Sequence, residues 1–348
     1  MKFQKILLPI SGIAVLLFLL SFFLPSKGGF GNAILEIDEP NFSDYEQVEQ
    51  KDSTLAAAIK TLLNRYHPPN AFILLMDANG EILSWGQREN DQASDEPTFL
   101  KRDSFPAASL AKIATAAAAL ESGKTPTAEV PKIGRNSTLY KRQINPPENH
   151  KGEFITLENA FAKSNNPAMG IFGMKLGKEK LQKAAEKLGF TNFNYPDSGF
   201  ALAESACGFT QRNTLSPLQA ANAVRKFLSG SSETKNGGAG GNFKKQTNEG
   251  MRQLFLKTVS DGTAKTAIRK SVYSYNRNAY DIGGKTGSLD GEFPMGRYDW
   301  FAGFAQSKTD QKKSLIIVVM QVHGKFRNQK SSTIAGMLIN EWAKSATK

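Results

Sequence analysis

The chain has 348 residues, 40% hydrophobic and 22% charged, which is the composition of a globular protein with a proper core. A single cysteine excludes an internal disulfide, and three scattered histidines argue against zinc hydrolysis and histidine-dependent triads. The net charge of +12 could suit nucleic acid, but the basic residues are spread out and form no recognised nucleic-acid-binding module. We therefore expect no nucleic-acid partner, no metal ion and no cofactor.

The N-terminal segment predicts a membrane anchor. Residues 6–24 form an unbroken uncharged run that is long enough to span a bilayer. Lys2 and Lys5 precede this run and favour a cytoplasmic N-terminus, so the remaining chain would lie on the periplasmic or extracellular side. A cleaved signal peptide is the alternative, although Pro25-Ser26-Lys27-Gly28 does not provide the small-x-small site that cleavage needs. We expect a single-pass protein of the cytoplasmic membrane, with residues 1–27 as tip and anchor.

The next segment, residues 28–69, is polar and acidic, and we interpret it as an extracytoplasmic tether with one amphipathic stretch at 55–66. A β-hairpin is expected after it, because apolar strands at 71–76 and 81–85 flank an Asn-Gly turn. A single catalytic domain is predicted to fill residues 70–348.

Helical patterns dominate the middle of this domain, from about residue 107 to 278. The expected helices are 107–121 with Pro106 in the first turn, 154–162, 168–187 and 216–227. Residues 229–250 are rich in Gly, Ser, Asn and Lys and predict a flexible loop.

The C-terminal third returns to strands at 279–288, 300–306 and 314–321, and a helix at 332–344 closes the chain. The apolar run 315–319 is typical of a central strand. Strands at both ends with helices between them predict a mixed α/β (α+β) fold: a central antiparallel sheet, flanked by helices, with an inserted all-helical subdomain. A cleft is expected where the sheet meets that subdomain.

A Ser-x-x-Lys pattern opens the helix at 107–121. Ser109 and Lys112 are one helical turn apart, which places a hydroxyl beside an amine that can accept its proton. Two further Ser-x-x-Lys patterns, at Ser232 and Ser345, lie in polar or terminal sequence and show how often the pattern arises by chance. Ser109 differs from them because it begins an apolar helix among small alanines.

A Ser-x-Asn pattern lies between two expected helices. Ser164 and Asn166 fall where one helix stops, and Pro167 marks the start of the next. A short turn there can hold a hydroxyl and an amide towards a neighbouring serine; helix capping is the ordinary alternative. A second Ser-x-Asn at Ser274 lies too close to Lys285 to form a separate wall of a cleft.

Lys285-Thr286-Gly287-Ser288 follows two further glycines in a strand-like run. Glycines permit another backbone to approach closely, so an extended peptide could pair with this strand. The lysine and the two hydroxyls suit a substrate carboxylate.

These three motifs, in this order, resemble the signature of the penicillin-binding protein and serine β-lactamase superfamily. The detailed likeness is to the transpeptidase domain of class B penicillin-binding proteins, over about residues 70–348. Further segments that resemble that family are 106–123, 215–220, 261–264 and 300–304. Ser288 departs from the usual threonine, and the stretch 216–262 is compact. We expect neither the family's large N-terminal module nor a glycosyltransferase domain before residue 70.

The resemblance implies a role for each catalytic residue. Ser109 would attack the penultimate D-alanine carbonyl of a peptidoglycan stem peptide, with Lys112 as general base kept neutral by burial and by Lys285. Ser164 would relay a proton to the leaving D-alanine, and Asn166 would hold a substrate amide. β-Lactams would trap Ser109 covalently.

The resemblance also implies a substrate-binding strand. Lys285, Thr286, Gly287 and Ser288 would bind the terminal carboxylate, and the backbone N–H groups of Ser109 and Ser288 would form an oxyanion hole. The expected partners are stem peptides, β-lactam antibiotics and proteins of a cell-wall synthesis complex.

The acceptor remains open at this point. An amine would make the enzyme a D,D-transpeptidase, whereas water would make it a D,D-carboxypeptidase, an endopeptidase or a β-lactamase. Glu204 is the candidate for the glutamate that positions water in class A β-lactamases, but it lacks the Asn that follows four residues on. A non-catalytic wall scaffold or β-lactam sensor is a further alternative.

Overall fold

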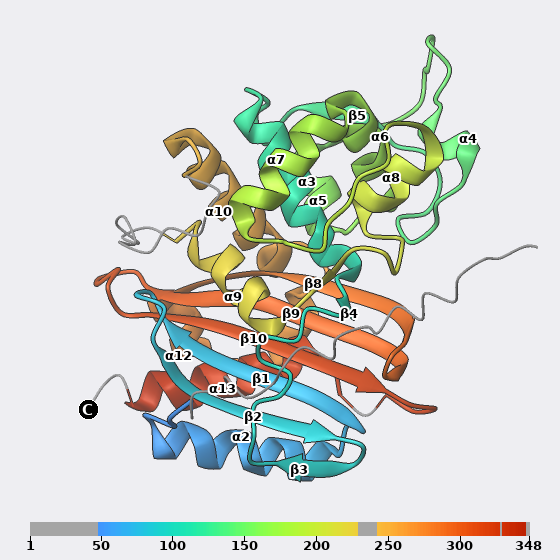
Figure 1. Cartoon of the computed structure of the whole chain (residues 1–348). Coiled ribbons are helices and arrows are strands. Elements are labelled where there is room, and N and C mark those ends of the chain that lie inside the picture. The colour runs from blue at the N-terminus through green and yellow to red at the C-terminus, as the bar shows by residue number, and fades with distance from the viewer. Residues whose placement is uncertain (1–47, 229–241, 328, 346–348) are drawn as a thin grey trace, which may run out of the picture. The chain divides into compact units, whose positions relative to one another are not determined.

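The computed structural model describes residues 48–228, 242–327 and 329–345, which belong to one compact unit (Figure 1). The expected membrane anchor, the first part of the tether and most of the predicted glycine-rich loop lie outside these residues. No helix within the described ranges has the length and apolar character needed to cross a membrane.

A six-stranded antiparallel sheet forms the centre of the part that the structure describes. Its order is β3-β2-β1-β10-β9-β8, so strands from the two ends of the domain meet where β1 pairs with β10. The predicted hairpin, the three C-terminal strands and the central position of 314–321 are confirmed. The strands are β1 (Asn70–Asp77), β2 (Ile82–Glu89), β3 (Gln92–Ser94), β8 (Tyr280–Glu292), β9 (Met295–Ser307) and β10 (Ser314–His323).

Helices cover both faces of the sheet. Each strand contributes apolar side chains to both faces, because successive side chains of a strand point to opposite sides. Along β1, Phe72 and Leu74 belong to the core beneath the helical subdomain, whereas Ile73 and Leu75 belong to a second core on the other face. Three helices bury their apolar sides in that second core: α2 (Ser53–Tyr66), α11 (Lys265–Ser271) and α13 (Ser331–Ser345).

Helix α2 lies within the segment that we expected to be a tether. It packs against β2 and α13 and buries Leu55, Ile59 and Leu63. The compact unit therefore includes residues before position 70.

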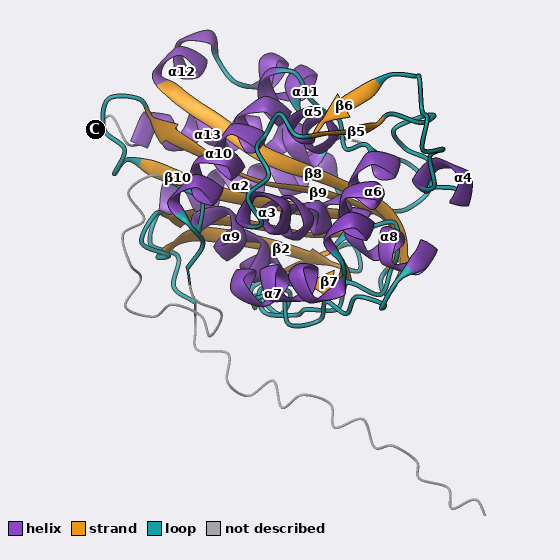
Figure 2. Cartoon of the chain, turned by 90° about the horizontal axis from the view of Figure 1, so that it is seen from above, coloured by secondary structure: helices purple, strands orange, loops and turns teal. Residues whose placement is uncertain are grey.

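The helical subdomain stands on the opposite face, as predicted (Figures 1 and 2). Its helices are α3 (Lys112–Glu121), α4 (Lys141–Ile144), α5 (Leu157–Ala162), α6 (Asn166–Leu176), α7 (Lys178–Leu188), α8 (Gly199–Cys207), α9 (Pro217–Arg225) and α10 (Lys245–Ser260). Helix α12 (Ser274–Ala279) instead contacts α13, because Asn276 donates to Asn340, so the subdomain ends before the predicted boundary near residue 278. Two small strand pairs complete it: β4 (Phe105–Pro106) with β7 (Thr214–Leu215), and β5 (Glu129–Pro131) with β6 (Phe154–Thr156).

Helix α3 is the axis of this subdomain, and Figure 2 shows other helices around it. Every residue of α3 except Glu121 is buried. Its many alanines let α6, α7, α8 and α10 approach on several sides. A helix that is apolar all round belongs in a core, which is where the structure places it.

Several sequence predictions need correction. The helix expected at 107–121 begins as a 3-10 turn at Ala108–Ala111, and Pro106 pairs in β4 instead of entering the first helical turn. Ala108 has a φ of 48°, which lies outside the right-handed helical region, so a regular α-helix cannot run through this residue. Residues 154–156 form strand β6, after which Thr156 caps α5 by accepting from Asn159 N–H.

The helix expected at 168–187 is two helices, because Gly177 between α6 and α7 has a φ of 81° and a ψ of 166°. The end of the predicted loop, from Lys245, is already helix α10, which buries Met251, Leu254 and Phe255.

A close contact fixes the turn before α3. Gly208, which ends α8, has a φ of 69°, and a Cβ added there would lie 1.8 Å from the carbonyl oxygen of Ala108. Only glycine fits this position, and the end of α8 thereby supports the 3-10 turn.

We expect Gly208→Ala to destabilise the protein by several kcal/mol, because the added methyl must displace backbone as well as strain it. Gly189→Ala is the matched control. Gly189 also ends a helix with positive φ (79°), yet nothing lies within 4 Å of its added Cβ, so it should cost only about 1–2 kcal/mol. Equal losses in urea denaturation of the two variants would contradict the importance of this contact.

Candidate active site

Ser109 and Lys112 are brought together as the sequence predicts. Ser109 lies on the 3-10 turn and Lys112 begins α3, so the lysine Nζ is 2.7 Å from the serine Oγ. Lys112 Nζ also donates to Asn166 Oδ1 (2.8 Å) and to the carbonyl oxygen of Cys207 (2.5 Å). The amine is thus held by three oxygens from three separate segments of the chain.

The surroundings of Lys112 favour its neutral form. The side chain is fully buried, and all three oxygens that it contacts are uncharged. Burial lowers the pKa of the Lys112 ammonium to about 8. A neutral amine next to a hydroxyl can accept its proton, which is what a general base must do.

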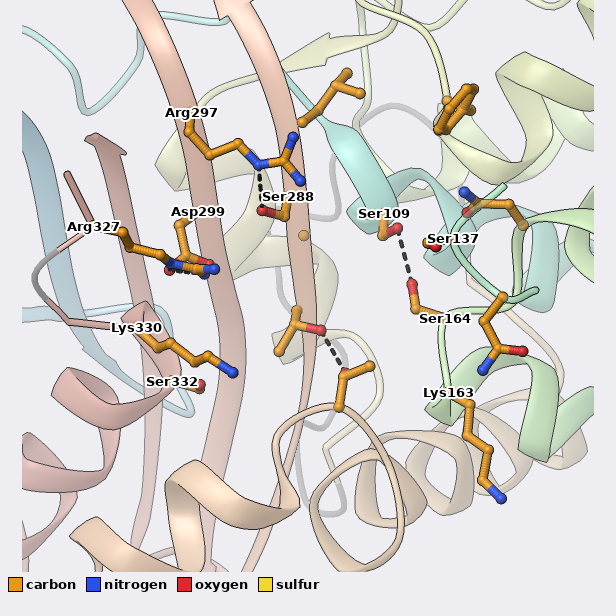
Figure 3. Close-up of a pocket in the computed structure, with 18 residues that line it drawn as sticks. Ser109, Ser137, Lys163, Ser164, Ser288, Arg297, Asp299, Arg327, Lys330 and Ser332 are labelled. Carbon is orange, nitrogen blue, oxygen red and sulfur yellow. Dashed lines mark hydrogen bonds and ion pairs between the residues drawn. The ribbon is translucent and has the colours of Figure 1, made fainter. Parts of the chain in front are cut away.

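Ser164 extends this contact to the next wall of the cleft. It occupies the turn between α5 and α6 with a φ of 53°, an uncommon conformation for a non-glycine residue. Its Oγ donates to Ser109 Oγ at 2.9 Å, as Figure 3 shows. Asn165 caps α6 and bonds to Asn136, which fixes the turn. Strain of this kind often marks functional positions.

Lys285 points towards Ser164 from strand β8. Its Nζ donates to Ser164 Oγ (3.1 Å) and to the carbonyl of Thr286 (2.9 Å), and the side chain is fully buried. Burial, together with the neighbouring charge of Lys112, holds the pKa of Lys285 well below its ordinary value. The structure therefore directs this amino group at Ser164, whereas the sequence led us to expect it at a substrate carboxylate.

The rest of the Lys-Thr-Gly-Ser motif lines the cleft. β8 is the edge strand of the sheet within the described residues, so its outer side can pair with a peptide. Gly287 lies against the turn of Ser109: its added Cβ would be 3.4 Å from the Ala107 oxygen. Thr286 Oγ1 contacts Thr263 Oγ1 at 2.5 Å, and Ser288 Oγ accepts from Arg297 Nε at 3.1 Å.

A cavity of about 320 Å³ joins these groups (Figure 3). Of the predicted site residues, it is lined by Ser109, Ser164, Asn166, Thr286, Gly287 and Ser288. The lining residues to which sequence reasoning gave no role are Asn136, Ser137, Lys163, Gly208, Phe209, Thr263, Leu289, Arg297, Asp299, Arg327, Lys330 and Ser332. The sequence could have indicated Thr263, because this residue falls in a segment that resembles the family. No sequence pattern indicated that the arginines and lysines line the cavity.

Two residues weighed on sequence grounds lie elsewhere. Glu204 is on α8 and is not among the residues that line the cavity. Ser274, from the second Ser-x-Asn, begins helix α12 and is likewise outside the cavity lining.

Comparison with known proteins agrees with this geometry. The family model for the penicillin-binding protein transpeptidase domain matches residues 71–341. The search of curated proteins found no significant match to the chain.

Solved structures with the same fold include two transpeptidase domains. That of the FtsI4 D,D-transpeptidase from Legionella pneumophila has 16% identity and a TM-score of 0.60, covering 86% of this chain and 98% of its own. That of penicillin-binding protein 3 from Burkholderia pseudomallei has 16% identity and a TM-score of 0.63, covering 88% and 98%. At such identities the likeness establishes the fold. The family model covers most of the chain, and by that match the protein belongs to the penicillin-binding protein transpeptidase family.

Proposed function

We propose that this protein is a peptidoglycan D,D-transpeptidase that forms an acyl-enzyme at Ser109 with stem peptides ending in D-Ala-D-Ala. The observation that carries the proposal is the continuous series of contacts from Lys112 through Ser109 and Ser164 to Lys285. Such a series supplies a base, a nucleophile and a proton donor without histidine.

Acylation would begin when Ser109 Oγ attacks the penultimate D-alanine carbonyl while Lys112 takes its proton. The negative charge that develops on the carbonyl oxygen would be met by the backbone N–H groups of Ser109 and Ser288. Lys112 suits the base role because burial lowers its pKa to about 8, so an appreciable fraction is neutral near pH 7.

The peptide bond would then break as Ser164 passes a proton to the leaving D-alanine nitrogen. Ser164 is suited to this role because it contacts both Ser109 Oγ and Lys285 Nζ. The proton that Lys112 removed from Ser109 would restore the one given up by Ser164. Asn166, which bonds to Lys112 and lines the cavity, would also hold a substrate amide.

A second stem-peptide amine would attack the ester and release Ser109, giving a cross-link. Water as acceptor would instead give a carboxypeptidase, endopeptidase or β-lactamase. The position of Glu204 outside the cavity lining disfavours a class A β-lactamase, in which a glutamate positions the water.

We also propose that the domain works outside the cytoplasmic membrane, tethered by residues 6–24. The proposal rests on the uncharged run and on the lysines that precede it. Peptidoglycan precursors would then reach the cleft from the wall side of the membrane. Other cell-wall synthesis proteins could bind the domain on the same side.

Labelled penicillin tests the nucleophile. We expect stable covalent labelling of the wild type and none of Ser109→Ala, because the acyl bond cannot form without the hydroxyl. Ser274→Ala is the control, since that serine lies in the other Ser-x-Asn pattern and outside the cleft, and it should label normally. Labelling of Ser109→Ala would refute the assignment, and rapid release of the drug by the wild type would indicate a β-lactamase.

The wild-type protein can also be used to test whether an amine or water accepts the acyl group. Incubation with a disaccharide pentapeptide and an acceptor amine should give a cross-linked product by mass spectrometry. Trimmed product alone would mean that water is the acceptor, and neither product together with stable penicillin labelling would favour a sensor.

The rate of acylation should depend on pH through Lys112. Only the neutral amine accepts a proton, so the rate should rise with pH and level off above a pKa of about 8. Single-turnover acylation by a fluorescent penicillin between pH 6 and 10 measures this profile. A rate that stays flat from pH 6 to 9 would show that Lys112 is not the base.

A further inference from the structure

A second cavity lies outside the catalytic cleft, beside the start of strand β8. Its volume is about 420 Å³, and it shares no lining residue with the cleft of Ser109. Helices α10 and α12 pack against β8, and α11 packs against α10 (Figure 2). All three helices and β8 contribute to the lining, so the cavity is formed by the fold and not by a single loop. Its volume falls in the range of about 300–1,000 Å³ that small-molecule sites occupy.

Part of the cavity wall is apolar. The apolar side chains are Leu256 and Val259 of α10, Ile268 of α11 and Ile282 of β8. Ile268 and Ile282 are buried in the second core, whereas Leu256 and Val259 are only partly buried. An apolar ligand would remove the remaining apolar surface from water, which is favourable.

Four cations line the same cavity: Lys265, Arg269, Arg277 and Lys308. The acidic residue in the lining, Asp281, is shared between two cations: its Oδ2 lies 2.8 Å from Arg252 Nη2, and its Oδ1 lies 4.0 Å from Lys308 Nζ. Asp261, which lies 3.4 Å from Lys265 Nζ, is likewise shared with another lysine. Two carboxylates are thus divided among four cations, which leaves an excess of positive charge at the cavity.

The two arginines add charge that no carboxylate balances. Within the ranges that the structure describes, neither Arg269 nor Arg277 has a carboxylate oxygen within 4.0 Å. Arg277 is half-buried, and its Nη1 donates to the backbone carbonyls of Arg269 (3.0 Å) and Val272 at the end of α11. These carbonyls are neutral, so they orient the guanidinium without supplying a counter-ion. A guanidinium has five N–H donors, and those that are not used at α11 can bind an anion.

We propose that this cavity binds a small amphiphilic anion, that is, an apolar body that carries one carboxylate or phosphate group. The anionic group would meet the arginines of α11 and α12, and the apolar body would cover the partly buried side chains of α10. Charged hydrogen bonds from the guanidinium groups would orient the ligand. A neutral apolar molecule would leave the cations without a counter-ion.

Three probes that share one apolar body test the proposal: 4-phenylbutyrate, 4-phenylbutyl phosphate and 4-phenylbutanol. Their dissociation constants are measured by ligand-observed NMR titration of the full chain in lipid nanodiscs, with empty nanodiscs as the blank. We expect at least one of the two anions to bind roughly 10-fold more tightly than the alcohol, as hydrogen bonds to a charged group would give. The tighter anion shows whether the site favours a carboxylate or a phosphate ester. The measurement needs no acylation of Ser109, so it does not depend on the proposed function.

The double variant Arg269→Gln/Lys308→Gln removes two exposed cations that are not needed for folding. It should weaken the tighter anion roughly 10-fold and leave the alcohol unchanged. Arg277→Gln should act in the same direction, but it also removes the donor at the end of α11, so urea denaturation must show that it folds. The double variant keeps the test decisive if Arg277→Gln does not fold.

Matched controls separate charge from apolar contact. Leu256→Ala should weaken all three probes alike, because it removes apolar contact and no charge. Arg65→Gln, at the end of α2, and Lys132→Gln, paired with exposed Glu153, change cations that do not line the cavity and should leave every dissociation constant unchanged.

Two results would overturn the inference: an alcohol that binds as tightly as both anions, or anion binding that the double variant leaves unchanged. A third would be a stable dimer, seen by light scattering, whose dissociation is required before the probes bind. That result would assign the cavity to a second copy of the chain.

Discussion

The burial of the Lys112 amine is the constraint on which the site depends. Burying a charged ammonium among uncharged oxygens is costly, so folding favours the neutral form. The oxygens that form hydrogen bonds with the amine come from the 3-10 turn, from α6 and from the end of α8. The reactivity proposed for Ser109 would therefore depend on how three segments converge, and not on the Ser-x-x-Lys pattern alone.

Small residues make this convergence possible. A Cβ added at Gly173 of α6 would lie 2.2 Å from the Cβ of Ala206 in α8, and Gly170 faces Ala203 in the same way. These contacts let α6 and α8 pack closely, which brings Asn166 and the Cys207 carbonyl to one amine. Thr115, one turn along α3, donates to the Ala206 carbonyl and fixes α8 further.

The sequence predicted what is local and missed what depends on distant partners. The alternation of apolar and polar residues and the apolar runs were enough to predict the strands of the sheet. A spacing of one helical turn was enough to predict that Ser109 lies beside Lys112. The 3-10 turn was missed because the positive φ of Ala108 is imposed by packing against Gly208 and β8, which no local pattern encodes.

The site residues divide in the same way. The three motifs were found because each lies within a few residues, and the structure brings them to one cleft. Arg327 and Lys330 reach that cleft from the segment between β10 and α13, and Asp299 in β9 holds Arg327 in place. Such a group is assembled from parts of the chain that are far apart in sequence, so spacing in the chain gives no indication of it.

The two buried lysines define how protons can be held in the cleft. Lys112 and Lys285 are linked through the hydroxyls of Ser109 and Ser164, and a charge on Lys112 disfavours a charge on Lys285. A proton accepted at one end of this series therefore makes release from the other end easier. The proposed reaction must both remove a proton from Ser109 and deliver one to the leaving nitrogen. Two amines that disfavour each other's charge, joined by two hydroxyls, would meet both requirements without histidine.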